Sequence, residues 1–194
     1  MTQIRPIRAV KIGGKVEKEI YIVITQTGSI VSKMLKKITG AEYNHVSVSL
    51  ESDLHYMYSF GRRYTYFPWW GGFVRESTEY GSMKRFADAS AIVLAIPVSE
   101  NTYDKVEDEL NVMLENKNEY YYDSIGLLLA GLNINYKRER HYYCSAFVRE
   151  LLVRFGIEDS ELFEPIVTPM HFLDIPDGNI IYRGRLSDYC KTAG

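Results

Sequence analysis

The sequence predicts an α+β domain in which a small antiparallel sheet packs against a helix that begins at Cys144. Apolar residues recur with a helical period from Phe147 to Phe155, and Gly156 follows where a helix stop is expected. Earlier in the chain, short apolar or alternating runs indicate strands. With 194 residues, 46% of them hydrophobic, we expect a single domain spanning 1–194 with a sizeable core.

The first half of the chain alternates strand and turn signals. Residues 19–25 are apolar and β-branched, which is typical of a buried strand. A short helix is predicted over 30–38, with Gly40 at its end. Residues 45–50 alternate valine and leucine with polar side chains, and a turn leads to a second strand over 54–60. We therefore expect this pair to form a hairpin.

An aromatic segment follows between Gly61 and Gly72. It is too aromatic for an ordinary loop and too irregular for one helix or strand. Two interpretations stand side by side: a wall that covers a substrate, or a satellite hydrophobic cluster beneath a long loop. The aromatic residues that would line such a wall are Tyr64, Tyr66, Phe67, Trp69 and Trp70.

The second half predicts most of the helices. A buried strand is expected over 91–97, and Asn101 is the expected N-cap of the helix after it. A short apolar helix is expected over 124–132, directly after Asp123. The Cys144 helix follows, then a helical turn over 170–175 and a closing strand over 179–184.

Composition excludes several classes of function. The net charge of −2 gives no global reason to expect nucleic acid or an anionic membrane as partner. Cys144 and Cys190 do not make a disulfide framework, and the chain has no ligand spacing typical of zinc, so we expect neither a metal nor a cofactor. The start of the sequence has no apolar leader, and the longest apolar run is too short to span a bilayer. A cytoplasmic location is the expectation.

Cys144 is the candidate nucleophile. At the first turn of a helix, free N–H groups and the helix dipole stabilise a thiolate, and the preceding segment 137–141 adds mostly positive charge. The alternative is a small buried cysteine that only packs. His45 is the candidate base at the start of its strand, and its alternative is a polar strand end. His141 is a second candidate base, whereas Cys190 looks incidental.

Three motifs, taken in order, resemble a known family. They are residues 22–35 (IVITQTGSIVSKML), residues 43–48 (YNHVSV) with the strand ending at 57–61 (MYSFG), and residues 142–148 (YYCSAFV). The chain resembles the circularly permuted NlpC-type papain-like cysteine hydrolases, the YiiX/YaeF-like group, which are related to the lecithin:retinol acyltransferase-like proteins. The resemblance spans about two-thirds of the chain and implies a permuted papain-like fold.

The resemblance implies roles for individual residues. Cys144 matches the family's nucleophile and His45 its general base. The third polar residue of the family lies on the strand after the histidine, which corresponds here to Tyr58, or to Ser59 if the turn is one residue shorter. The backbone N–H of Cys144 would stabilise the oxyanion, with Gln26 as a second donor. Tyr143 is a further oxyanion or orienting candidate.

The function expected from this resemblance is a cysteine peptidase or amidase. It would cleave an amide, in a peptide or a peptidoglycan fragment, through a thioacyl intermediate on Cys144. The first alternative is acyl transfer or ester hydrolysis on a lipid, with Tyr56 and the aromatic segment lining an acyl cleft. The second alternative is a binding module without activity, because an uncharged Tyr58 would support an imidazolium less well than a carboxylate.

Overall fold

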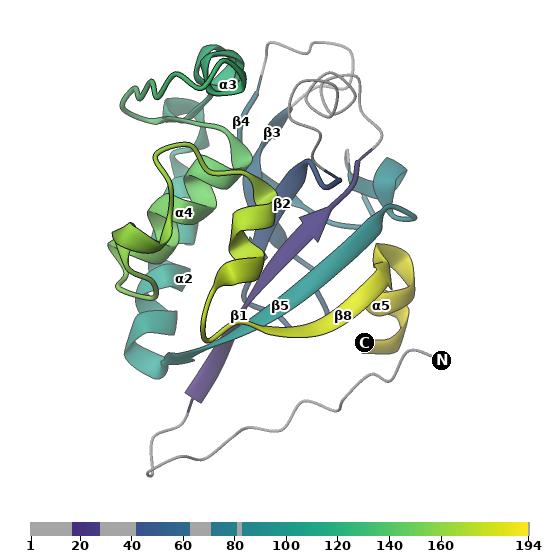
Figure 1. The fold of residues 1–194 in the computed structure, drawn as a ribbon. Helices are drawn as coiled ribbons and strands as arrows, with labels where there is room; N and C mark the ends of the chain where they lie inside the picture. Colours follow the sequence, from purple (N-terminus) through teal and green to yellow (C-terminus); the bar gives the residue numbers. More distant parts are fainter. Residues whose placement is uncertain (1–16, 28–41, 63–70, 81–82, 194) are drawn as a thin grey trace.

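A computed structural model describes residues 17–27, 42–62, 71–80 and 83–193. It is a mixed α+β structure with a six-stranded antiparallel sheet in the order β4-β3-β2-β1-β5-β8 (Figure 1). The predicted fold class is confirmed at this level. The strands are β1 (Glu17–Thr25), β2 (His45–Ser49), β3 (Met57–Arg62), β4 (Gly71–Glu76), β5 (Ser90–Ser99) and β8 (Asn179–Arg185).

The central strand β1 is buried on both faces, as its β-branched sequence predicts. Ile20, Ile22 and Ile24 point to one face, and Tyr21 and Val23 point to the other. The strand pairs with β2 and β5 along its length, so its backbone groups are used on both sides. The two cores of the protein therefore meet at β1.

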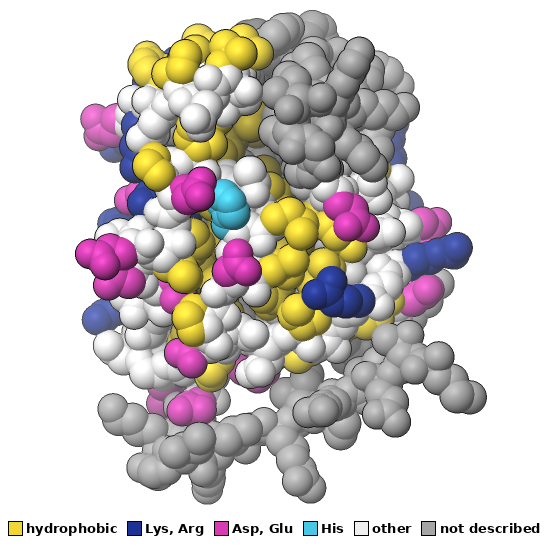
Figure 2. All heavy atoms as spheres, in the orientation of Figure 1, with side chains coloured by type: hydrophobic (Ala, Val, Ile, Leu, Met, Phe, Trp, Pro, Cys, Tyr) yellow, Lys and Arg dark blue, Asp and Glu magenta, His cyan; other side chains and the backbone are white. Residues whose placement is uncertain are grey.

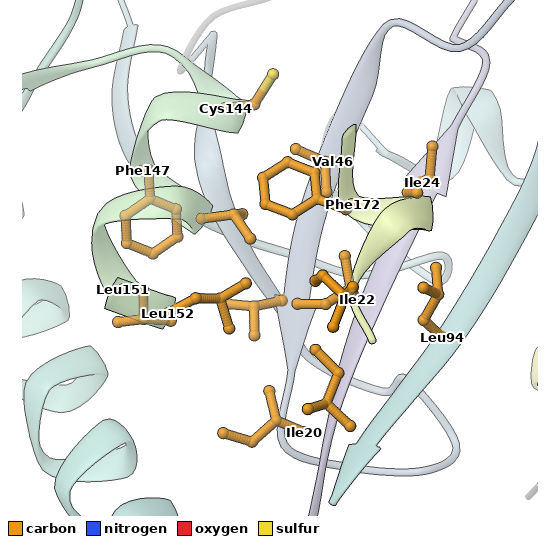
Figure 3. Close-up of a cluster of buried hydrophobic side chains, with 14 of the residues drawn as sticks. Ile20, Ile22, Ile24, Val46, Leu94, Cys144, Phe147, Leu151, Leu152 and Phe172 are labelled. Carbon is orange, nitrogen blue, oxygen red and sulfur yellow. The ribbon is translucent and has the colours of Figure 1, made fainter. Parts of the chain in front are cut away.

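Two helices and a 3₁₀ helix cover the first face of the sheet. The helix α4 (Cys144–Arg154) packs its Phe147, Leu151 and Leu152 onto Val46 of β2 and the isoleucines of β1 (Figure 3). The same core holds the buried residues of α2 (Glu100–Glu115) and Phe172 of the 3₁₀ helix Pro169–Asp174. This packing fixes the position of the first turn of α4 relative to the start of β2.

The second face is covered by shorter elements. The C-terminal helix α5 (Leu186–Ala193) contributes Leu186 and Tyr189 to a core with Val23 and Met57. The Tyr189 hydroxyl donates to the carbonyl of Ser52, which ties α5 to the turn between β2 and β3. Three further 3₁₀ helices, Met83–Phe86, Lys117–Glu119 and Ser160–Leu162, lie in connecting segments.

A small excursion leads into α4. The two-residue strands β6 (Tyr121–Tyr122) and β7 (His141–Tyr142) pair in parallel, and α3 (Ser124–Gly131) lies between them in sequence. The chain therefore leaves and returns at the same place, immediately before Cys144. No helix among the described residues is both long and apolar enough to cross a bilayer.

Several local predictions need correction. The N-cap of α2 is Ser99, whose hydroxyl accepts from the N–H of Thr102, and not Asn101. The strand β4 was not predicted, because it begins at two glycines, which are poor strand formers. The helix α5 was missed as well. The helix expected over 30–38 lies outside the described residues.

Candidate active site

Cys144 opens the helix α4 at the end of the sheet where β2 begins. The residue before it, Tyr143, has an extended backbone and is the N-cap of the helix. The first hydrogen bond of the helix runs from the N–H of Phe147 to the carbonyl of Tyr143. The N–H of Cys144 therefore precedes the intrahelical ladder, at the positive end of the helix dipole. The residue is 7% exposed, and its sulfur points away from the apolar cluster below it (Figure 3).

His45 is held in place by its neighbour Asn44. The Asn44 side chain accepts from both the N–H and the hydroxyl of Thr27, at 3.0 and 2.8 Å, and donates to the carbonyl of Thr27 at 3.1 Å. The backbone of Asn44 also donates to Thr25. These bonds tie the first residue of β2 to the segment after β1 and limit the positions that the imidazole can take.

The imidazole of His45 contacts a carboxylate and a hydroxyl. Its Nε2 lies 3.0 Å from Oε2 of Glu76 and 3.2 Å from Oγ of Ser47. The Ser47 hydroxyl donates to the same carboxylate oxygen at 2.7 Å. Because an ionised carboxylate only accepts, we assign the hydrogen to Nε2, and Nδ1 is the ring nitrogen left for another partner.

Cys144 is the other side chain whose hydrogen bond helps to raise the pKa of His45. Because Nε2 is held by Glu76, we assign Nδ1 to Cys144. Burial by itself lowers the pKa of His45. The negative charge of Glu76 and the hydrogen bonds to Cys144 and Glu76 outweigh it and leave the pKa of His45 well above its ordinary value. Burial by itself raises the pKa of Glu76. The charge of His45 and the hydrogen bonds from His45 and Ser47 outweigh burial and leave this pKa below its ordinary value, so the carboxyl stays ionised. An imidazolium beside a sulfur stabilises a thiolate.

Glu76 reaches His45 across an intervening strand. It ends β4, whereas His45 begins β2, and β3 lies between them. A side chain added at Gly61 of β3 would place its Cβ 3.6 Å from Oε1 of Glu76. A methyl group at position 61 would therefore touch the carboxylate at an ordinary contact distance, and a larger side chain would have less room.

The structure corrects the prediction that Tyr58 or Ser59 is the third residue of the site. Tyr58 pairs with Val48, so it points to the opposite face from Ser47 and stacks on Phe73. Ser59 is buried, and its hydroxyl donates to the backbone carbonyl of Val46. Glu76 holds the place beside the imidazole. The sequence shows no strand signal for this residue, because Glu76 follows two glycines, two apolar residues and an arginine, which do not alternate as a half-buried strand does.

The two oxyanion candidates are neighbours of the pair in the sheet or in the chain. The N–H of Gln26 donates to Ser90, so its backbone is fixed at the end of β1, next to Thr25, which pairs with His45. Tyr143 precedes the nucleophile directly. Burial and the nearby Cys144 raise the pKa of its phenol, which also hydrogen-bonds the Val167 backbone.

The alternative base and the second thiol have other surroundings. His141 stacks on Tyr121 with 5.1 Å between ring centroids, and its Nδ1 bonds the carbonyl of Glu139. Cys190 lies on α5 beside the second core, and burial raises the pKa of its thiol. Neither shares the environment of the His45–Cys144 pair.

The aromatic wall can be followed only at one residue. The ring of Tyr56 lies under the guanidinium of Arg75 at 4.2 Å and meets His55 and Tyr80 edge-on. The other aromatic residues of the expected wall, Tyr64, Tyr66, Phe67, Trp69 and Trp70, lie outside the described residues. Among the residues that the structure describes, no group of acidic, histidine and cysteine side chains could hold a metal ion.

Comparison with known proteins adds no assignment. No family model matches the chain, and no curated protein matches it. The site thus combines a thiol at a helix N-terminus, a histidine beside it and an ionised carboxylate beside the histidine. These groups can supply the nucleophile, the base and the orienting residue of a thiol-dependent acyl transfer.

Proposed function

We propose that this protein is a cysteine hydrolase that cleaves an amide through a thioacyl intermediate on Cys144. The observation that carries the proposal is the position of His45, which is bonded to Glu76 on one side and lies within hydrogen-bonding reach of Cys144 on the other. The permuted papain-like, NlpC-type fold that the motifs resemble is part of the proposal. Its support is the order of the parts, with the histidine strand before the cysteine helix.

The reaction follows from the charges of the site. The Cys144 thiolate attacks the carbonyl carbon, and the negative charge that forms on the carbonyl oxygen is stabilised by the N–H of Cys144. The His45 imidazolium then gives its Nδ1 proton to the leaving amine as the C–N bond breaks. Water next attacks the thioester, the imidazole takes its proton, and the acid leaves with the thiolate restored. Glu76 keeps the imidazole oriented and stabilises its charged form.

The ionised Glu76 also bears on the binding-module alternative. The binding-module alternative depends on an uncharged residue in the third position. The buried carboxylate that is bonded to the imidazole supports the enzyme instead. Amide cleavage in a peptide or peptidoglycan fragment remains the first substrate class, and ester or amide cleavage on a lipid is the second.

The experiment uses a general acylating substrate. The purified full chain is mixed with the p-nitrophenyl ester of a short acyl chain, and the release of nitrophenolate is followed while the adduct is mapped by mass spectrometry. We expect a burst of about one nitrophenolate per protein and an acyl group on Cys144. Cys144→Ala should abolish both, and His45→Ala should slow acylation by roughly 10²- to 10⁴-fold.

Cys190 provides an internal control in the same chain. Iodoacetamide labelling at pH 6 should modify Cys144 much faster than Cys190, and His45→Ala should remove most of that difference. Equal labelling of the two thiols, or acylation at Cys190 alone, would contradict the proposed chemistry.

A further inference from the structure

Exposed hydrophobic side chains are concentrated on one small part of the molecule. Of the nine large hydrophobic residues that are exposed among those described, six lie between residues 121 and 136. We call these six the α3 surface. They gather where α3 projects from the end of the molecule, away from the sheet (Figures 1 and 2). The six are Tyr121, Ile125, Leu128, Leu132, Ile134 and Tyr136.

The helix α3 is apolar without being buried. Only Gly126 of its eight residues is buried, whereas Ile125 and Leu128 are 54% and 55% exposed and Leu132, just after the helix, is 65% exposed. No residue from 124 to 136 carries a charge. A helix that is hydrophobic all round is normally found in a protein core or in lipid. Here the residues that the structure describes bury only Gly126 of α3 and leave Ile125 and Leu128 more than half exposed.

The exposure is built into well-formed structure. The buried Asp123 caps α3 by accepting from the N–H of Gly126 at 2.9 Å, and the same oxygen accepts from Arg138 at 2.5 Å. At the other end Asn133 has a φ of 60°, and the N–H of Ile134 bonds back to Leu129. Both ends of the apolar helix are therefore fixed.

We propose that the α3 surface inserts into one leaflet of a lipid bilayer. The exposed residues Ile125, Leu128 and Leu132 lie on one face of α3, and the uncharged stretch from 124 to 136 offers no charge to pair with a protein partner, whereas an uncharged apolar face suits lipid. Eight residues are far too few to span the hydrocarbon core, for which about 20 are needed, so α3 enters the leaflet without crossing it. Tyr121 and Tyr136 at the border, with Lys137 beside them, suit the polar headgroup level.

The surface adjoins the candidate active site. The chain passes from the α3 surface through β7 directly to Tyr143 and Cys144. Docking through α3 would hold the N-terminal end of α4 near the lipid. The inference rests on exposure and does not depend on the chemistry proposed for Cys144.

The test is co-sedimentation of the full chain with vesicles of phosphatidylcholine and phosphatidylglycerol. We expect the wild-type protein to partition onto the vesicles, and the double variant Leu128→Ser/Leu132→Ser to bind at least about 10-fold more weakly. The matched control is Val112→Ser/Ile180→Ser, which removes two exposed hydrophobic residues elsewhere, 48% and 43% exposed. The control should bind like the wild type, as should Cys144→Ala.

Three results would overturn the inference. One is a wild-type protein that stays in the supernatant at all lipid concentrations. The second is equal binding by both double variants, with circular dichroism showing that they are folded. The third is a wild-type dimer in analytical ultracentrifugation that Leu128→Ser/Leu132→Ser dissociates, without any vesicle binding, which would assign the α3 surface to a second copy of the chain. Loss of acylation in Cys144→Ala with intact vesicle binding separates this inference from the proposed function.

Discussion

Nε2 of His45 lies 3.0 Å from Oε2 of Glu76, although a whole strand separates the two strands that carry them. Ser47 bridges the pair, since its hydroxyl donates to the carboxylate and its oxygen faces Nε2. The carboxylate of Glu76 thus accepts hydrogen bonds from two side chains of β2, those of His45 and Ser47. This arrangement restrains the rotation of the imidazole and leaves Nδ1 for Cys144.

Removing the charge of Glu76 should slow acylation and move its pH dependence. In Glu76→Gln, the pKa of His45 loses its strongest support and falls, so the imidazolium is lost at lower pH. We expect nitrophenolate release to slow by at least about 10-fold, within the roughly 10²- to 10⁴-fold that acid–base catalysis supplies, and the basic limb of the pH–rate profile to move down. Glu119→Gln, at an exposed carboxylate paired with Arg140, is the control and should leave both unchanged. An unmoved basic limb in Glu76→Gln would argue against the orienting role.

Ser47 should act through the carboxylate. Its hydroxyl helps to lower the pKa of Glu76, so Ser47→Ala raises that pKa and the acid limb of the pH–rate profile should move up. A hydrogen bond to a charged group contributes about 1.5–3 kcal/mol, so the acylation rate near the acid limb should fall by roughly 10-fold or more. Ser47→Thr keeps the hydroxyl and should restore the profile. A threonine variant that behaves like alanine would point to packing instead.

The space at Gly61 should control whether Glu76 reaches His45. A single Cβ there meets the Glu76 carboxylate at an ordinary contact distance of 3.6 Å, so Gly61→Ala should keep most activity. Gly61→Val adds two methyl groups to a Cβ that already touches the carboxylate, so it should crowd Glu76, while valine itself suits a strand. We expect Gly61→Val to melt within a few degrees of the wild type, yet to acylate as slowly as Glu76→Gln. Equal activity of the alanine and valine variants would show that the carboxylate is not displaced.

The His45–Glu76 pair should give stability a defined pH range. The lowered pKa of Glu76 stabilises the folded protein at pH values above the unfolded pKa of about 4.3. This stability is lost as the pH falls through the folded pKa. The raised pKa of His45 contributes stability that is complete below about 6.5 and is lost as pH rises through the folded pKa. The melting temperature of the wild type should exceed that of Glu76→Gln most between about pH 4.5 and 6.5. A difference that is constant from pH 3 to 9 would contradict this linkage.

The local patterns predicted much of the secondary structure. The β-branched run of β1 and the alternation of β2 carry a strand period that burial on a sheet requires, and both strands formed where they were expected. The period of Phe147, Leu151 and Leu152 placed α4, and the helix begins at Cys144 itself. Where the signal was weak, as at the glycines that open β4, the element was missed.

The sequence by itself determined which groups have chemistry to offer, because helix dipole, strand period and residue type are local properties. It set Cys144 at a helix start and His45 at a strand start. Only the tertiary structure decided that Glu76 would complete the contact, since that depends on the order of three strands and on the space left at Gly61. Only it decided, too, that the apolar α3 would stand in solvent, because burial depends on what packs around a helix and not on the helix alone.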